Sequence, residues 1–292
     1  MKRLWDKDQE KTFFTETRKF ASLEQLFYLS DDGRYYAYWP KNYKESKTTL
    51  QARNALIGSF TEKWSANLLR DFAQSKDYYI VQGAVCDEIG LPKRSSADLA
   101  ICRVPNIVQR AEDILLIFEV KMSVVWNWEL KLVNDKEELI CLGDYRTHQG
   151  NPGLLRSDSM LKAIGKSINI RVSSAKASKI PIIVLGNTPI TNAYYKKVDH
   201  LRTSGIIQGF WSINSMPLDN DRENIKSTNG LGFYRFDTYE EFANKLEELF
   251  GGEREFFSGM RTKDELGRMI EIANREDSYK KKAEKLLALI RE

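Results

Sequence analysis

Two charged residues stand at the end of a short, strongly apolar segment near the middle of the sequence. The segment Ile114–Lys121 begins with five apolar residues and ends with Glu119, Val120 and Lys121. A run this short, rich in branched and aromatic residues, is typical of a strand buried on both faces. Burial of a carboxylate and an ammonium group is unfavourable unless each has a partner or a metal ion. Because side chains two apart on a strand share a face, Glu119 and Lys121 should project together into a candidate site.

A second carboxylate stands one strand earlier in the sequence. Asp98 lies near the start of Ala97–Val104, a mostly apolar segment that Pro105 ends. The connection from this segment to Ile114–Lys121 is short, and short connections favour antiparallel neighbours. We therefore expect Asp98 on the strand beside the one that carries Glu119.

A third acidic residue, Glu62, falls in a segment with helical periodicity, from about Thr48 to Gln74. Large apolar residues recur there at every fourth position: Leu56, Phe60, Trp64 and Leu68. This spacing is typical of a helix with one buried side. Glu62 lies on a second row of mostly small residues, which would let the helix approach a sheet closely. By position alone, its carboxylate is either solvated at the edge of that interface or directed at a site, and the solvated alternative is favoured.

The other apolar runs, bounded by turn residues, predict further strands and the helices between them. The additional expected strands are Tyr78–Cys86, Lys179–Gly186, Ile206–Ile213 and an edge strand at Phe233–Phe236. A hairpin over Val124–Leu132 and Glu138–Leu142, turning at Asn134–Asp135, either extends the sheet or protrudes from it.

Capping residues and periodicity place the expected helices after the central strand. Ser157 or Asp158 can cap a helix that runs to about Arg171. Its expected apolar side consists of Met160, Leu161, Ile164 and Ile168. Further helices are expected near Asn192–Arg202 and after the capping-box signatures Thr238–Glu241 and Thr262–Glu265. These elements divide the chain into an N-terminal extension that packs on the core (1–47), the core (48–236) and a C-terminal helical region (237–292).

Composition narrows the class of protein. The 292 residues carry a net charge of +4, which permits a nucleic-acid partner without requiring one. Cys86, Cys102 and Cys141 are isolated, and His148 and His200 are the only histidines, so zinc sites and serine–histidine catalysis have little support. The sequence contains neither a signal-peptide pattern nor an apolar run long enough to span a bilayer. We therefore expect a soluble, cytoplasmic prokaryotic protein.

The order of elements resembles the PD-(D/E)XK nuclease superfamily, best known from type II restriction endonucleases. The resemblance covers about residues 48–213 and rests on Glu62, Asp98, Glu119 and Lys121, with Ala97 where the motif often has proline. It implies an α/β fold with a restriction-endonuclease-like core, a central mixed β-sheet flanked by helices, and N-terminal and C-terminal helical additions.

The resemblance also implies a chemistry, the hydrolysis of phosphodiester bonds in double-stranded DNA at a specific site. Mg²⁺ would be the cofactor, with Mn²⁺ able to substitute, because hard cations prefer oxygen ligands. Asp98 and Glu119 would bind the metal, with the backbone carbonyl of Val120 as a further ligand. Lys121 would position or activate the attacking water, and Glu62 would assist.

Possible DNA contacts follow from the same resemblance. The candidate residues are Lys93, Arg94, Ser95, Ser96, Arg103, His148, Gln149, Asn151, Arg156 and Lys162. Solvated charged loops are the alternative interpretation. A restriction enzyme would act as a homodimer, since two sites are needed to cut both strands, with a cognate DNA methyltransferase as its genetic partner. The alternatives are a nuclease of repair, recombination or transposition on the same fold, and a non-catalytic DNA-binding protein.

Overall fold

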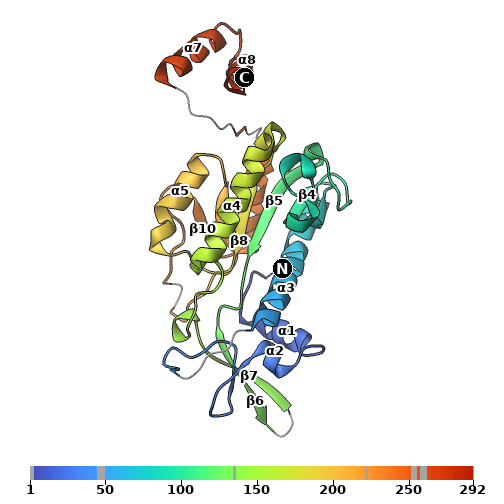
Figure 1. Cartoon of the computed structure of the whole chain (residues 1–292), viewed down its shortest axis with the longest axis vertical. Coiled ribbons are helices and arrows are strands. Elements are labelled where there is room, and N and C mark those ends of the chain that lie inside the picture. The colour runs from blue at the N-terminus through green and yellow to red at the C-terminus, as the bar shows by residue number, and fades with distance from the viewer. Residues whose placement is uncertain are drawn as a thin grey trace.

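A mixed β-sheet forms the centre of the molecule. The computed structural model describes residues 3–44, 50–133, 136–220, 223–250, 255–256 and 262–291. Within these residues, a six-stranded sheet is flanked by helices in an α/β arrangement (Figure 1). Its strands, in spatial order, are β10 (Phe233–Arg235), β9 (Gly209–Ser212), β8 (Ile182–Gly186), β5 (Ile114–Lys121), β4 (Ala97–Cys102) and β3 (Tyr79–Ala84). The expected central mixed sheet with flanking helices is therefore confirmed.

The sheet changes from antiparallel to parallel pairing at β5. Strands β3, β4 and β5 pair antiparallel, as their short connections predict, whereas β5, β8, β9 and β10 pair parallel. Parallel neighbours need crossover connections. Helix α4 (Ser157–Ser173) lies on the crossover to β8, and α5 (Tyr195–Thr203) joins β8 to β9.

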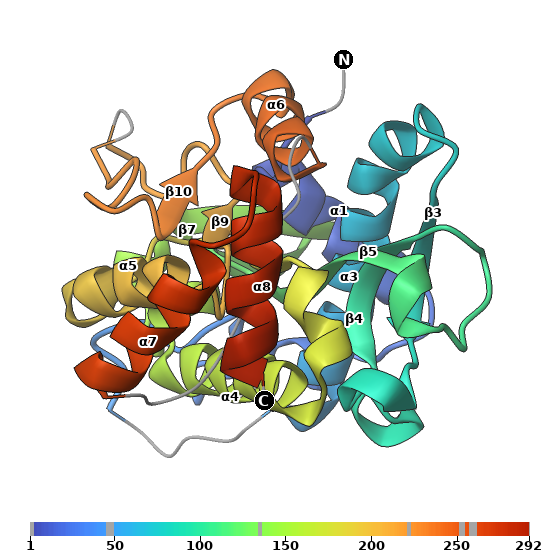
Figure 2. The same ribbon diagram turned by 90° about the horizontal axis from the view of Figure 1, so that it is seen from above.

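Different helices cover the two faces of the sheet. One apolar cluster joins α1 (Lys7–Thr17), α3 (Gln51–Gln74) and α6 (Tyr239–Phe250) to the face that contains Leu116 and Phe118. Helices α4 and α5 pack on the opposite face, which contains Ile117 and Val184. Seen from above, α6 and α4 lie on opposite sides of the sheet (Figure 2). Glu119, which alternates with Phe118, therefore faces α4.

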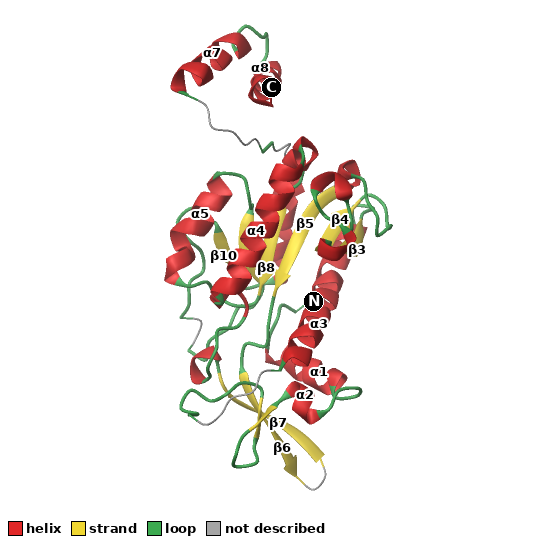
Figure 3. Ribbon diagram, viewed as in Figure 1, coloured by secondary structure: helices red, strands yellow, loops and turns green. Residues whose placement is uncertain are grey.

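The hairpin after β5 belongs to a second, smaller sheet. Strands β6 (Asn127–Val133) and β7 (Lys136–Gly143) join β1 (Tyr28–Leu29) and β2 (Tyr35–Tyr36) in the order β1-β2-β6-β7. This antiparallel sheet lies beyond the end of the central one (Figure 3). The hairpin thus protrudes and does not extend the central sheet. Its expected turn at Asn134–Asp135 lies outside the described residues.

Helix α4 differs from the expectation at its start and on its buried side. Arg156 holds the N-cap position, without a capping side-chain hydrogen bond among the described residues, so the predicted cap at Ser157 or Asp158 is wrong. Two residues of the predicted apolar side are exposed, Leu161 by 61% and Ile168 by 40%. The side chains that α4 buries are those of Met160, Ala163, Ser167, Ile170 and Arg171. The buried side therefore includes Ala163, Ser167 and Arg171, which a search for large apolar residues does not select.

The two ends of the chain contribute differently to the fold. Helices α1 and α2 (Leu23–Leu26) lie in the N-terminal region that was expected to be helical, although the sequence analysis did not locate them, and they pack near α3. At the other end, α7 (Lys263–Ala273) and α8 (Tyr279–Arg291) contact each other and lie apart from the sheet (Figure 1). Short 3₁₀ helices lie at Asp87–Ile89, Lys93–Ser95, Ala111–Asp113, Tyr145–Thr147, Gly153–Leu155, Ala175–Lys179 and Asn192–Tyr194. None of the helices in the described part of the chain combines the length and apolar character needed to cross a membrane.

Candidate active site

Strands β4 and β5 bring two carboxylates together at one end of the sheet. The antiparallel register pairs Leu99 with Phe118, so that Asp98 and Glu119 lie side by side one residue further on. Both side chains point to the face that α4 covers. The backbone N–H of Val120 donates to Asp98 Oδ2 at 2.7 Å, which holds the Asp98 carboxylate against β5.

Two lysines bridge this pair of carboxylates. Lys121 Nζ lies 3.1 Å from Asp98 Oδ2 and 3.2 Å from Glu119 Oε2. On α4, Lys166 Nζ lies 2.6 Å from Glu119 Oε1 and 3.4 Å from Asp98 Oδ1. Lys166 also donates to the carbonyl of Ser96 at 2.6 Å. Two negative and two positive charges therefore form one compact cluster.

Glu119 is the most deeply buried member of the cluster, with 1% of its side chain exposed. Its Oε1 accepts no aligned hydrogen bond from the described residues, although the ammonium group of Lys166 is in ion-pair contact with it. Burial, and then the charge of Asp98, raise the pKa of Glu119, while Lys121 and Lys166 oppose the rise. The charged form therefore depends on cations held close to the carboxylate.

Lys121 remains a cation in this environment. Burial acts to lower its pKa, but the charges of Asp98 and Glu119 outweigh burial and leave the pKa above its ordinary value. An ammonium group with a raised pKa can donate hydrogen bonds and stabilise negative charge, but it is a poor base near neutral pH. This favours positioning over proton abstraction among the two roles expected for Lys121.

Glu62 approaches the cluster from the opposite face of the sheet. It is partly buried on α3 and accepts a hydrogen bond from Gln82 of β3 at 3.2 Å. Burial, and then the charge of Asp98, raise its pKa, with Lys121 and Lys166 opposing. Glu62 therefore lies half-buried at the edge of the helix–sheet interface, within electrostatic range of the cluster, and its role in the site stays a prediction.

A cleft of about 720 Å³ begins at this cluster. Val120 and Lys121 line it on the side of the sheet. Four of the residues expected to contact DNA also line it: Gln149, Asn151, Arg156 and Lys162. Arg156 and Lys162 both lie near Asp158, at 3.6 and 3.1 Å. The loop before α4 and the first turns of α4 therefore form one wall of a polar, basic cleft.

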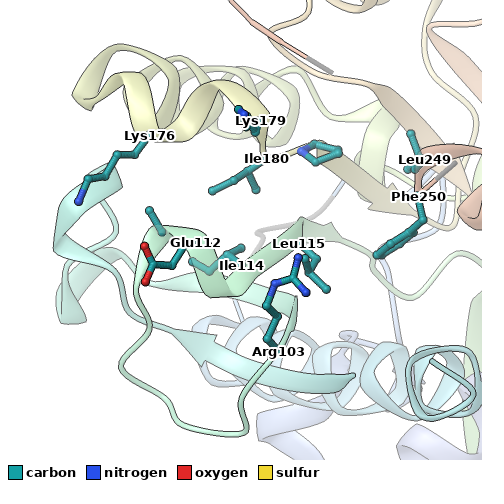
Figure 4. A pocket seen from close by; sticks show the side chains of 11 residues that line it. Arg103, Glu112, Ile114, Leu115, Lys176, Lys179, Ile180, Leu249 and Phe250 are labelled. Atoms are coloured by element: carbon teal, nitrogen blue, oxygen red, sulfur yellow. The ribbon is translucent and has the colours of Figure 1, made fainter. Parts of the chain in front are cut away.

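The remaining candidate contacts have different surroundings. Lys93, Arg94 and Ser95 form an exposed turn before β4, next to Ser96, whose carbonyl contacts Lys166. Arg103 directly follows β4, at the opposite end of the strand from Asp98. It lines a separate pocket of about 480 Å³ with Ile114, Lys176 and Lys179 (Figure 4).

His148 is buried against Tyr38, outside the lining of the cleft. Only 4% of the residue is exposed, and its ring stacks on Tyr38 at a centroid distance of 3.9 Å. Its two ring nitrogens lie 3.1 Å from the carbonyl of Gln149 and 3.3 Å from that of Val125. Burial lowers its pKa. His148 packs the loop against the small sheet and is not among the residues that line the cleft, and its expected DNA contact stays a prediction.

Lys166 is the site residue that the sequence analysis missed. It lies three residues after Ala163 and four before Ile170, at the border of the buried side of α4. The sequence analysis predicted a buried side centred on Leu161 and Ile168. With that side buried, Lys166 would lie on the exposed side of the helix. The spacing of Lys166 from Ala163 and Ile170 is the sequence signal that would have indicated its position beside the buried side of α4.

The donor set limits which cations could bind. Among the described residues, no three His, Cys, Asp or Glu side chains converge as a complete metal-binding group. Asp98 and Glu119 nevertheless supply paired carboxylate oxygens, and the carbonyl of Val120 lies 3.3 Å from Lys121 Nζ, on the same side. Oxygen donors of this kind suit Mg²⁺, which keeps several waters and needs few protein ligands.

Comparisons of the chain with protein-family models, curated proteins and solved structures gave no match. The geometry of the cluster and the cleft therefore carries the functional proposal.

Proposed function

We propose that this chain is a metal-dependent endonuclease of the PD-(D/E)XK type that hydrolyses phosphodiester bonds of double-stranded DNA. One observation carries the proposal: a pair of carboxylates, one fully buried, is held together by two lysines at the mouth of a basic cleft. The strands and helices that hold Glu62, Asp98 and Glu119–Lys121 follow the order of that superfamily, which supports the proposal as an analogy of arrangement.

The residues fit a divalent cation by their chemistry. Asp98, Glu119 and the Val120 carbonyl offer oxygen atoms on one side of the sheet end. Glu119 Oε1 is buried without an aligned hydrogen bond, and the lysines supply the compensating charge. A bound Mg²⁺ would polarise the phosphate and lower the pKa of a coordinated water.

The protein side chains would perform the other tasks. The ammonium group of Lys121 would hold the attacking water and stabilise charge that develops on the phosphate. Lys166 would keep Glu119 ionised and oriented from α4. Glu62, whose pKa is raised, would accept a hydrogen bond from a water on the other side of the cluster. Asp98 is fixed by the Val120 N–H, so it would keep its position when a cation binds.

The restriction-type role is the finer part of the proposal. It would include cleavage at a specific sequence by a homodimer, with a cognate DNA methyltransferase encoded nearby. A nuclease of repair, recombination or transposition would share the same site chemistry. The four-charge cluster is internally balanced, which also suits a non-catalytic DNA-binding protein. These alternatives differ in what the protein does to DNA.

The test is incubation of the protein with supercoiled plasmid and linear phage DNA, with Mg²⁺ or with EDTA. Discrete fragments that appear only with Mg²⁺ are expected from a restriction enzyme. Metal-dependent degradation or nicking without discrete fragments would favour the repair-type alternative. Binding without any cleavage would favour the non-catalytic protein. Asp98→Asn should abolish cleavage, whereas Glu112→Gln, an acid-to-amide change at an exposed position before β5, should leave it unchanged.

A further inference from the structure

Arg53, near the start of α3, is a buried cation on the wall of the cleft that also contains Lys121. Only 3% of the residue is exposed. Its guanidinium group lies between the rings of Tyr28 and Tyr38, 5.0 Å from each centroid. Trp39 stacks on Tyr28, and His148 stacks on Tyr38, so aromatic groups fix the plane of the guanidinium from both sides.

The charge of Arg53 is not balanced within the described residues. Nη1 donates to two backbone carbonyls, those of Leu26 and Ala37. Nε is buried without a hydrogen-bond partner, and no carboxylate in the described part of the chain forms an ion pair with this residue. Burial lowers the pKa of Arg53, which reflects the unfavourable environment. A buried cation that lacks an anion is strongly disfavoured unless a ligand provides one.

The face of α3 beside Arg53 leaves room for a ligand. Asn54 and Gly58 line the same cleft, and Glu62 continues this row at the next turn. A Cβ built at Gly58 would meet no atom within 4 Å. Glycine in a helix interior is less stable than alanine, and no packing at this position requires it. The open space therefore faces the cleft.

The other charges of the cleft favour an extended anion. Cations line it at Arg53, Lys121, Arg156 and Lys162, and Asp158 is the one carboxylate among its described lining residues. Amide side chains of Asn54, Gln149 and Asn151 also line the cleft. Several cations together with neutral amides suit a chain of phosphates better than one small anion.

We propose that Arg53 binds a phosphodiester group of the nucleic-acid backbone, distinct from the phosphate that reacts at Lys121. This inference rests on the proposed nuclease function, because it assigns the cleft to the same DNA strand. The planar guanidinium is held between Tyr28 and Tyr38, and its Nε has no partner among the described residues, so this N–H can donate to a phosphate oxygen. Binding would supply the anion that the buried cation lacks.

The test measures DNA binding without cleavage, in EDTA, by fluorescence anisotropy over a series of NaCl concentrations. Arg53→Met removes the charge and keeps a similar length. The Kd should rise at least about tenfold. The slope of log Kd against log NaCl concentration should fall by about one, as expected for the loss of one phosphate contact. Loss of the unbalanced charge favours the folded state, whereas loss of the hydrogen bonds to Leu26 and Ala37 opposes it, so the melting temperature of the variant is measured to establish that it is folded. A folded Arg53→Met protein that binds within twofold of wild type would overturn the proposal.

A second pair of variants decides the question if Arg53→Met does not fold. Gly58→Ala adds a neutral methyl group to open space, and Gly58→Glu adds a carboxylate to the same space. Gly58→Glu should bind at least about tenfold more weakly than Gly58→Ala, because its carboxylate repels phosphates and can pair with Arg53. Equal affinities of these two variants would contradict the assignment.

The choice of probes separates this inference from the nuclease proposal. Each protein is titrated with a labelled duplex and with one of its single strands, which shows which form supplies the phosphodiester. Wild-type protein that binds neither form would overturn both proposals. Wild-type protein that binds and cuts, with an affinity insensitive to both Arg53→Met and Gly58→Glu, would overturn only the role of Arg53.

Discussion

Two buried glutamic acid side chains in this molecule have different partners. Glu10 of α1 is fully buried, and its oxygens accept hydrogen bonds from neutral N–H groups of four residues: Trp5, Val125, Trp126 and Trp128. Glu119 of β5 is almost as buried, but its contacts are the ammonium groups of Lys121 and Lys166. One acid is surrounded by fixed dipoles and the other by charges on long side chains.

The difference separates a structural acid from a candidate functional acid. The donors to Glu10 are backbone groups and indole rings of the core, so they join α1 to the connection between β5 and β6. The partners of Glu119 lie on flexible stems beside a cleft, and a cation or substrate can displace them. Burial alone therefore does not indicate function, whereas burial with displaceable cations next to a cleft does.

The largest expected effect is on catalysis, from Glu119→Gln. If the nuclease proposal holds, loss of a metal-binding oxygen charge should reduce the Mg²⁺-dependent cleavage rate by about a thousandfold. The melting temperature should change little, because the amide fills the same space. Single-turnover cleavage of plasmid DNA measures the rate, with Glu112→Gln as the exposed control. If a folded Glu119→Gln protein cleaves DNA at the wild-type rate, Glu119 is not a functional acid and does not differ from Glu10 in this respect.

The corresponding change at the other acid, Glu10→Gln, should act on stability. An amide has one acceptor oxygen, so about two of the four N–H groups would lose their partners, and the free energy of unfolding should fall by about 2–4 kcal/mol. Urea unfolding measures this, with the exposed Glu16→Gln on the same helix as control. Protein that remains folded should cut DNA at the wild-type rate. A loss of activity without a loss of stability would contradict the structural role of Glu10.

The pH dependence of stability provides a finer test of the same acid. Burial raises the pKa of Glu10 from 4.5 to about 8, with its four hydrogen bonds opposing the rise. The folded state thus holds a proton that the unfolded state has released between these values. The contribution of Glu10 to the free energy of unfolding is fully present below pH 4.5. It declines as the pH rises toward 8, by at most about 1.4 kcal/mol per pH unit. Urea unfolding at several pH values should show this decline in the wild type, and Glu10→Gln should flatten it.

Part of this organisation could be read from the sequence, because it depends on local patterns. The buried run Ile114–Lys121 is β5 with the predicted bounds, and short connections predicted its antiparallel pairing with β4. The juxtaposition of Asp98 and Glu119 follows from that pairing. Their nuclease role stays a prediction.

Other parts depend on contacts between distant segments. Glu10 carries no sequence signal, because three of its four donors are set by how α1 packs on residues 125–128. Lys166 was not predicted as a site residue, because the large residues Leu161 and Ile168, which are exposed on α4, indicated the wrong buried side. Arg53 lies among predicted helix residues, and its environment arises only when β1 and the segment after β2 pack against α3.

The smallest expected effect concerns metal affinity and tests whether the lysines at Glu119 are displaceable. Lys166 Nζ is 2.6 Å from Glu119 Oε1, so a divalent cation that binds this oxygen must compete with the ammonium group. Lys166→Met should therefore lower the Kd for Mn²⁺, measured by titration calorimetry without DNA, by about tenfold, equivalent to about 1.4 kcal/mol. Lys162→Met, one turn earlier and exposed, should leave the Kd unchanged. An unchanged or weaker affinity in Lys166→Met would mean that Lys166 holds Glu119 in place as rigidly as the four N–H donors hold Glu10, and the distinction between the two acids would fail.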